Sequence, residues 1–145
     1  MRHIQYIIGM VILGLAGNIS AQELDDHLWK NRLVLVYTED PSGSLYKEQI
    51  EVLKGDIAGL EDRKLVIYHY TPDAVKKGLE DGKWKKRDDR SEKYTETKGN
   101  FEVLLLGLDG RVKLRQQTLL SREKLYSTID AMPMRQSELR RRETQ

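Results

Sequence analysis

Residues 101–135 constrain the fold more than any other stretch, because their local signals follow one another without a gap. Residues 101–106 (FEVLLL) are a short apolar run between two glycines, which predicts a buried strand. Asp109-Gly110 then predicts a two-residue type I′ turn, since both residue types accept the positive φ that this turn requires. The stretch therefore predicts a β-hairpin that belongs to the core.

The second strand of this hairpin alternates between apolar and basic residues. We expect Val112 and Leu114 to face the core. The outward face then carries the cations Arg111, Lys113 and Arg115. This basic face is a candidate binding surface, and a solvated strand face without a partner is the alternative interpretation.

A helix is predicted to follow the hairpin. Ser121 is a suitable N-cap for it. Leu125, Ile129 and Met132 form one apolar stripe at helical spacing. Pro133 cannot continue the hydrogen-bond ladder of this helix, although it can open a new turn, so the helix is expected to end just before it.

Asp130 and Arg135 lie at the end of this helix and complete the candidate surface site. We expect Asp130 to bind Arg135 or a backbone amide rather than to act in catalysis. Residues 140–145 are predicted to form a basic disordered tail. A frayed helix end and a segment that binds an acidic partner are both open interpretations of that tail.

The first half of the chain predicts a β-α-β unit. Residues 32–37 (RLVLVY) contain five consecutive apolar residues, which predicts a fully buried central strand. Residues 64–70 (KLVIYHY) predict a second strand that runs parallel to the first. Between them a single helix is expected, with Ser44 as its N-cap. Its apolar stripe consists of Tyr46, Ile50, Leu53, Ile57 and Leu60.

Shorter segments complete the predicted domain. An amphipathic turn before the first strand is expected to pack Trp29 onto the edge of the domain. Thr71-Pro72 predicts the start of a short helix. Residues 76–98 mix both charge signs without an apolar period, which predicts a solvated loop with one short helix near residues 91–95. A ligand-binding insertion is the alternative for this long segment.

Residues 1–21 have the three parts of a secretory signal: the basic Arg2, an apolar stretch over residues 4–16, and small residues before a cut ahead of Gln22. An uncleaved anchor helix is the alternative, although the apolar run is shorter than the roughly 20 residues that span a bilayer. We therefore expect export to the periplasm or the extracellular space. One domain over residues 22–139 is expected to remain, without stable membrane insertion after signal removal.

Composition excludes several classes of chemistry. The chain has no cysteine, which excludes a disulfide, a thiol nucleophile, a thiolate metal site and a redox pair. Beyond the predicted signal the histidines are His27 and His69, and their spacing fits no zinc hydrolase signature, so we expect neither a metal nor a cofactor. The formal net charge of +2 gives no reason to expect binding to nucleic acid.

The predicted order of elements is similar to that of a thioredoxin-like domain. Such an α/β domain is a three-layer sandwich with a central mixed four-stranded sheet and flanking helices. In that fold the chemistry lies in the loop between the first strand and its helix, where the helix N-terminus lowers the pKa of a thiol. Here the loop offers hydroxyl and carboxylate groups, and a histidine lies at the same end of the neighbouring strand. The candidate loop residues are Thr38, Asp40, Ser42, Ser44 and His69.

Five parts of the chain form a more specific pattern: residues 29–36, Gln49, residues 62–63, residues 101–113 and residues 129–136 (IDAMPMRQ). In this pattern the chain resembles the exported domain-of-unknown-function family 4174. That family is similar to modules in animal secreted matrix proteins of the sushi-repeat type, and it has been related to thioredoxins and peroxiredoxins. The resemblance implies the fold and export, and it implies no particular reaction.

Two classes of function stay open from the sequence. The first is a non-catalytic exported binding module whose partner is an envelope or extracellular protein or a glycan, and a structural role in an envelope assembly is a variant of it. The second is an enzyme with Thr38, Ser42 or Ser44 as a non-thiol nucleophile. A serine nucleophile needs a positioned base and an oxyanion site. Contact between the loop and His69 is possible, but a strand histidine is more often a packing residue. The sequence also has no thiol, metal or phosphate-loop signature, so the binding module is preferred.

Overall fold

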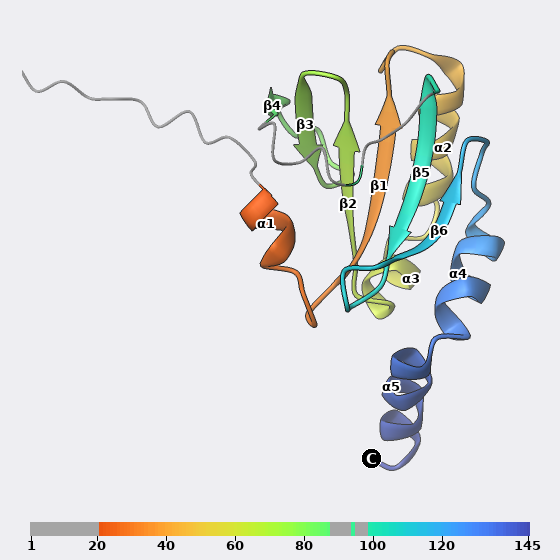
Figure 1. The fold of residues 1–145 in the computed structure, drawn as a ribbon. Helices are drawn as coiled ribbons and strands as arrows, with labels where there is room; N and C mark the ends of the chain where they lie inside the picture. The colour runs from red at the N-terminus through yellow and green to blue at the C-terminus, as the bar shows by residue number, and fades with distance from the viewer. Residues whose placement is uncertain (1–20, 88–93, 95–98) are drawn as a thin grey trace, which may run out of the picture.

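The computed structural model describes residues 21–87, 94 and 99–145, and these form a mixed α/β fold (Figure 1). Its six strands make one sheet in the order β4-β3-β2-β1-β5-β6. The strands are β1 (Arg32–Thr38), β2 (Leu65–Tyr70), β3 (Ala74–Lys77), β4 (Lys85–Lys86), β5 (Phe101–Leu106) and β6 (Val112–Gln116). The five helices of the described residues are α1 (Ala21–Asp25), α2 (Ser44–Lys54), α3 (Ile57–Asp62), α4 (Arg122–Asp130) and α5 (Pro133–Glu143). The signal predicted at residues 1–21 lies outside the described residues except for its last position.

Strand β1 is the centre of the sheet. All seven of its residues are buried, which the unbroken apolar run predicts. It pairs in parallel with β2 and antiparallel with β5. The predicted β-α-β unit with two parallel strands is therefore confirmed.

The sheet has six strands, so the prediction of four is wrong. Thr71-Pro72 predicts the start of a short helix, but strand β3 follows instead, because Thr71 closes the hairpin turn between β2 and β3 and does not cap a helix. Its N–H donates to the Ala74 carbonyl at 2.9 Å, and the Ala74 N–H donates to Thr71 Oγ1 at 3.0 Å. Strand β3 pairs antiparallel with β2, and β4 extends the sheet further. The helix predicted near residues 91–95 lies outside the described residues apart from Tyr94.

Helices α2, α3 and α4 pack on one face of the sheet, and the short helix α1 packs on the other (Figure 1). The larger apolar cluster joins the sheet to α2, α3 and α4 and includes Val36, Leu53 and Leu125. A second cluster on the opposite face includes Leu35 and packs beneath Leu24 of α1. Since both faces are buried, consecutive residues of the central strands can all be apolar.

The turn between β5 and β6 is longer than the predicted two-residue turn. Gly110 has a φ of +72°, whereas Asp109 is not among the residues with positive φ. The Gly110 N–H donates to the Gly107 carbonyl at 3.0 Å and closes the turn. The predicted type I′ turn is therefore wrong, because one left-handed residue instead of two reverses the chain.

A bulge changes which side chains of β6 face the core. Leu105 pairs with Leu114, whereas Leu106 pairs with Val112, so Lys113 is an extra residue in the ladder. An extra residue reverses the alternation of side chains beyond it. Leu114 accordingly packs against the larger cluster, as predicted, while Val112 faces away from it and is 42% exposed. The predicted inward orientation of Val112 is wrong.

The single helix predicted after β1 is two helices. Helix α3 has its own N-cap, Asp56, whose side chain accepts a bond from an amide of the first turn. Of the two stripe residues on α3, Leu60 is buried as predicted, whereas Ile57 is 42% exposed. The residue before α2 is Gly43, and Ser44 is the first helical residue, so the predicted cap is off by one.

The C-terminal helices follow local signals closely. Ser121 caps α4 as predicted, since its Oγ accepts the N–H of Lys124 at 3.2 Å. Pro133 opens α5, which extends to Glu143 and so includes the first part of the predicted tail at residues 140–145. Within the described ranges, none of the helices combines the length and the apolar character that crossing a bilayer requires.

Gln49 joins α2 to the segment before α4 and provides a test of this packing. Its side chain is buried, donates to the Leu120 carbonyl at 3.0 Å and accepts the Leu120 N–H at 2.7 Å. We expect Gln49→Leu to lower the free energy of unfolding by about 2 to 4 kcal/mol, because it leaves two buried backbone groups without partners. Urea denaturation measures this effect, with the exposed Glu48→Leu as the control. Equal stability of the two variants would show that Leu120 finds other partners.

Candidate functional site

The predicted candidate loop lies at the C-terminal end of β1, and its polar groups bind one another. Thr38 Oγ1 donates to the Asp40 carbonyl at 3.0 Å, and the Asp40 N–H donates to Thr38 Oγ1 at 3.1 Å. Asp40 Oδ1 accepts bonds from Ser42 Oγ at 2.6 Å and from the Ser42 N–H at 2.9 Å. These bonds from Ser42 lower the pKa of Asp40. Together with Ser44, which starts α2, the loop forms a turn that its own side chains close.

His69 does not join this loop. It is fully buried on β2, with Nδ1 2.8 Å from the Tyr46 hydroxyl and Nε2 2.7 Å from the Gly78 carbonyl. Because a carbonyl can only accept, Nε2 carries the proton and Nδ1 accepts from the tyrosine. Burial lowers the pKa of His69 to about 4, so the imidazole is neutral near pH 7. Neither nitrogen is left to act as a base for a loop serine.

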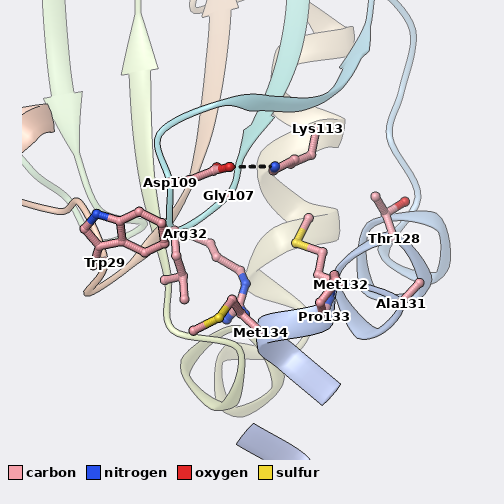
Figure 2. Close-up of a pocket in the computed structure, with 11 residues that line it drawn as sticks. Trp29, Arg32, Gly107, Asp109, Lys113, Thr128, Ala131, Met132, Pro133 and Met134 are labelled. Carbon is pink, nitrogen blue, oxygen red and sulfur yellow. Dashed lines mark hydrogen bonds and ion pairs between the residues drawn. The ribbon is translucent and has the colours of Figure 1, made fainter. Parts of the chain in front are cut away.

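A groove lies at the other end of β1, and we call it the sheet-end groove (Figure 2). Its volume is about 550 Å³, within the range of pockets that hold small molecules. Three parts of the chain form it: the residues around the start of β1, the β5–β6 turn, and the junction of α4 and α5. The apolar wall consists of Leu108, Ala131, Met132, Pro133 and Met134.

Trp29 stands at the mouth of the sheet-end groove. Its side chain is 67% exposed, so the predicted packing of Trp29 onto the domain edge is wrong. Its φ is +62°, a left-handed conformation that costs a residue with a side chain about 1 to 2 kcal/mol. The Trp29 N–H donates to the Leu108 carbonyl at 2.7 Å and ties this strained residue to the β5–β6 turn. Strain and an exposed aromatic ring at one position are typical of a binding site.

Arg32, the first residue of β1, forms the floor of the sheet-end groove and is fully buried. Its Nη1 donates to the Arg63 carbonyl at 3.0 Å. Nη1 and Nη2 donate to the two carboxylate oxygens of Glu138 at 3.3 and 3.2 Å. The Nε atom is buried and has no hydrogen-bond partner. The floor therefore keeps one donor of a charged group unsatisfied.

An ion network lies behind this floor and centres on Arg135, which is 2% exposed. Its Nε donates to Asp130 at 3.2 Å, its Nη2 donates to Asp62, and its Nη1 lies 3.5 Å from Glu138. Arg63 binds Asp130 from the other side at 2.7 Å. The expectation that Asp130 binds Arg135 is therefore confirmed.

The arginines hold the carboxylates of this network ionised. The hydrogen bond from Arg142, followed by that from Arg135, lowers the pKa of Asp62. Burial tends to raise the pKa of Asp130 and of Glu138, but the arginines that bind them lower both pKa values overall. Since these pKa values are lower in the folded chain than in the unfolded one, the network stabilises the fold above about pH 4 and loses this effect as the pH falls further.

The cations of the candidate surface site do not form one patch. Lys113 lines the sheet-end groove and pairs with Asp109 at 2.9 Å, and Arg111 lies 4.0 Å from the same carboxylate. Arg115 binds both oxygens of the buried Glu102, at 2.9 and 2.8 Å, on the sheet itself. Of the three, Lys113 alone lines the sheet-end groove.

The sheet-end groove is the feature that sequence reasoning missed. From the sequence, we assign Arg32 to a strand and Met132 to the apolar stripe of a helix, and we assign no role to Met134. One signal was present, because Met134 is a large apolar residue outside every predicted periodic stripe. In the described part of the chain, no three histidine, aspartate or glutamate side chains gather as a metal site requires.

Arg135 provides a test of the ion network. We expect Arg135→Met to lower the free energy of unfolding by about 3 kcal/mol at pH 7, because it leaves carboxylates without their buried partner. The value is at the low end for such a change, since Asp62 and Asp130 are over a third exposed. The loss is expected to shrink as the pH falls below about 4, where the carboxylates gain protons. Urea denaturation across pH measures it, with the exposed Arg140→Met as the control; a loss that does not change with pH contradicts the assignment.

Comparison with known proteins confirms the family that the sequence pattern resembles. The family model of the domain of unknown function DUF4174 matches residues 23–138. No curated protein and no solved structure matches the chain. The matched range includes β1, the β5–β6 turn and the start of α5, which together form the sheet-end groove. The chain belongs to the DUF4174 family, a family of unknown function.

Proposed function

We propose that this chain is an exported, non-catalytic binding module and that the sheet-end groove is its binding site. The observation that carries the proposal is the combination of an apolar groove of about 550 Å³ with the strained and exposed Trp29 at its mouth. A contiguous apolar surface is typical of a ligand-binding groove or an interaction surface. Met132 and Met134 suit this role, because methionine side chains adapt their shape to a ligand.

We further propose that the module uses a thioredoxin-like scaffold. Two parallel strands, β1 and β2, with the antiparallel β5–β6 hairpin beside them, support this relation. The candidate loop follows β1 and precedes α2, the position of the redox site in that fold. With hydroxyl groups at this position and no cysteine, the scaffold is proposed to have lost redox chemistry and to bind at its other end.

Export is proposed from residues 1–21, whose basic start and apolar stretch fit a secretory signal. The absence of cysteine fits either side of a membrane, so the signal alone supports export. A ligand in the periplasm or the extracellular space is therefore proposed. The apolar wall of the groove favours an apolar ligand over a glycan, since a glycan needs many hydrogen-bonding groups around it.

The enzyme alternative has weaker support. A hollow of about 520 Å³ lies beside the candidate loop, between Glu39 and Trp84. Ser42 Oγ, however, donates to Asp40 within the loop, and both nitrogens of His69 bind Tyr46 and Gly78. A serine nucleophile needs a base that takes its proton, and this arrangement supplies no imidazole for that step.

Trp29 can report on binding directly. In the variant Trp84→Phe it is the single tryptophan of the chain. We expect its fluorescence to shift to shorter wavelength, in a saturable manner, on titration with 1-decanol, because a ligand in the groove removes water from the exposed indole.

A filled groove is the matched control for this titration. Ala131→Phe places a large side chain in the groove and is expected to abolish the shift, whereas Ala58→Phe, at an exposed position on α3, is expected to retain it. If the shift is absent in the Trp84→Phe chain, or if it persists with Ala131→Phe, the groove is not the binding site.

A further inference from the structure

We propose that the natural ligand of the sheet-end groove is a single-chain amphiphile whose carboxylate binds Arg32. The inference rests on the proposed function and names the chemistry of its ligand. The apolar chain of the ligand lies along the wall that Met132 and Met134 provide, and the carboxylate accepts the unused N–H of Arg32 Nε.

The unsatisfied donor is the first observation. Within the described part of the chain, two buried side-chain atoms have no hydrogen-bond partner, Arg32 Nε and the Tyr70 hydroxyl. Of these residues, Arg32 lines the groove. A buried donor of a charged group that lacks an acceptor is costly, so its presence on the floor of a binding groove indicates that the ligand supplies the acceptor.

The second observation is the sign of the charge around the floor. Five cationic side chains share three carboxylates there. Glu138 alone faces Arg32, Lys64 and Arg135, at separations of 3.2, 3.7 and 3.5 Å. Among the described residues, the one carboxylate that lines the groove is that of Asp109, which is already paired with Lys113. This excess of positive charge favours an anionic head group and disfavours a cationic one.

A third observation concerns the size of the head group and its access. One free N–H matches a single carboxylate oxygen, whereas a phosphate group would need several donors to replace its water. Arg32 is fully buried, and its side chain extends toward Met134 at the edge of the groove (Figure 2). Met134 also lines the groove and is 48% exposed, and we propose that a change of its rotamer gives the head group access to Nε.

The test compares three ligands with the same ten-carbon chain and different heads, each below its micelle concentration. In the Trp84→Phe chain at pH 7, we expect decanoate to bind at least about tenfold more tightly than 1-decanol, because a charge-assisted hydrogen bond is added. Decyltrimethylammonium is expected to bind more weakly than 1-decanol. Equal binding of decanoate and 1-decanol overturns the carboxylate assignment and leaves the binding site in place, whereas no binding of any of the three overturns the proposed function.

Two further measurements locate the head group. Arg32→Lys keeps the positive charge and removes Nε, so the ratio of the affinities for decanoate and 1-decanol is expected to fall to about one. In the wild-type chain, the Nε–H nuclear magnetic resonance signal of Arg32 is expected to move with decanoate and to stay in place with 1-decanol. If Arg32→Lys does not fold, this signal decides alone: a signal that decanoate leaves in place contradicts the inference.

Discussion

The ion pairs of Arg135 are the interaction on which the rest of the structure depends. Helix α5 has one buried residue, Arg135, and none of its apolar residues, Pro133, Met134 and Leu139, is buried. An isolated helix of 11 residues is marginal in water, so contacts with the rest of the chain must hold α5 in place. Those contacts are electrostatic, since Arg135 binds Asp62 of α3 and Asp130 of α4, and Glu138 of α5 binds Arg32 of β1.

This network explains why a groove exists at this end of the sheet. Residues 132–134 form the first turn of α5 and the approach to it, and they supply one wall of the groove. The opposite side is the β5–β6 turn, which the Trp29 N–H binds through Leu108. The two sides are connected through Arg32, whose guanidinium reaches Glu138 below the floor. Arg32 therefore takes part both in the groove and in the ion pairs that hold α5.

Local sequence patterns predicted most helices and strands correctly, but they did not predict the contacts between elements that lie far apart in the sequence. The burial of β1, its parallel pairing with β2 and the Ser121 cap follow from short-range periodicity and capping, and the structure confirms them. The bulge at Lys113 was not predicted, because it depends on pairing between strands rather than on the strand itself. The partner of Arg32 is Glu138, 106 positions away, which no local pattern can indicate. The candidate loop was predicted from the position of a redox site and proved to lie at the end of β1 opposite the groove.

The central claim is that charge, rather than apolar packing, fixes α5 to the sheet. Hydrogen–deuterium exchange of the backbone amides of residues 137–143 tests it most directly, because these amides are protected only while α5 is docked and helical. We predict that they exchange far more slowly than an unfolded peptide at pH 7, and that Glu138→Gln raises their exchange rates while the amides of β1 stay protected. Exchange of α5 at the rate of an unfolded peptide in the wild-type chain, or protection that Glu138→Gln leaves unchanged, would contradict the claim.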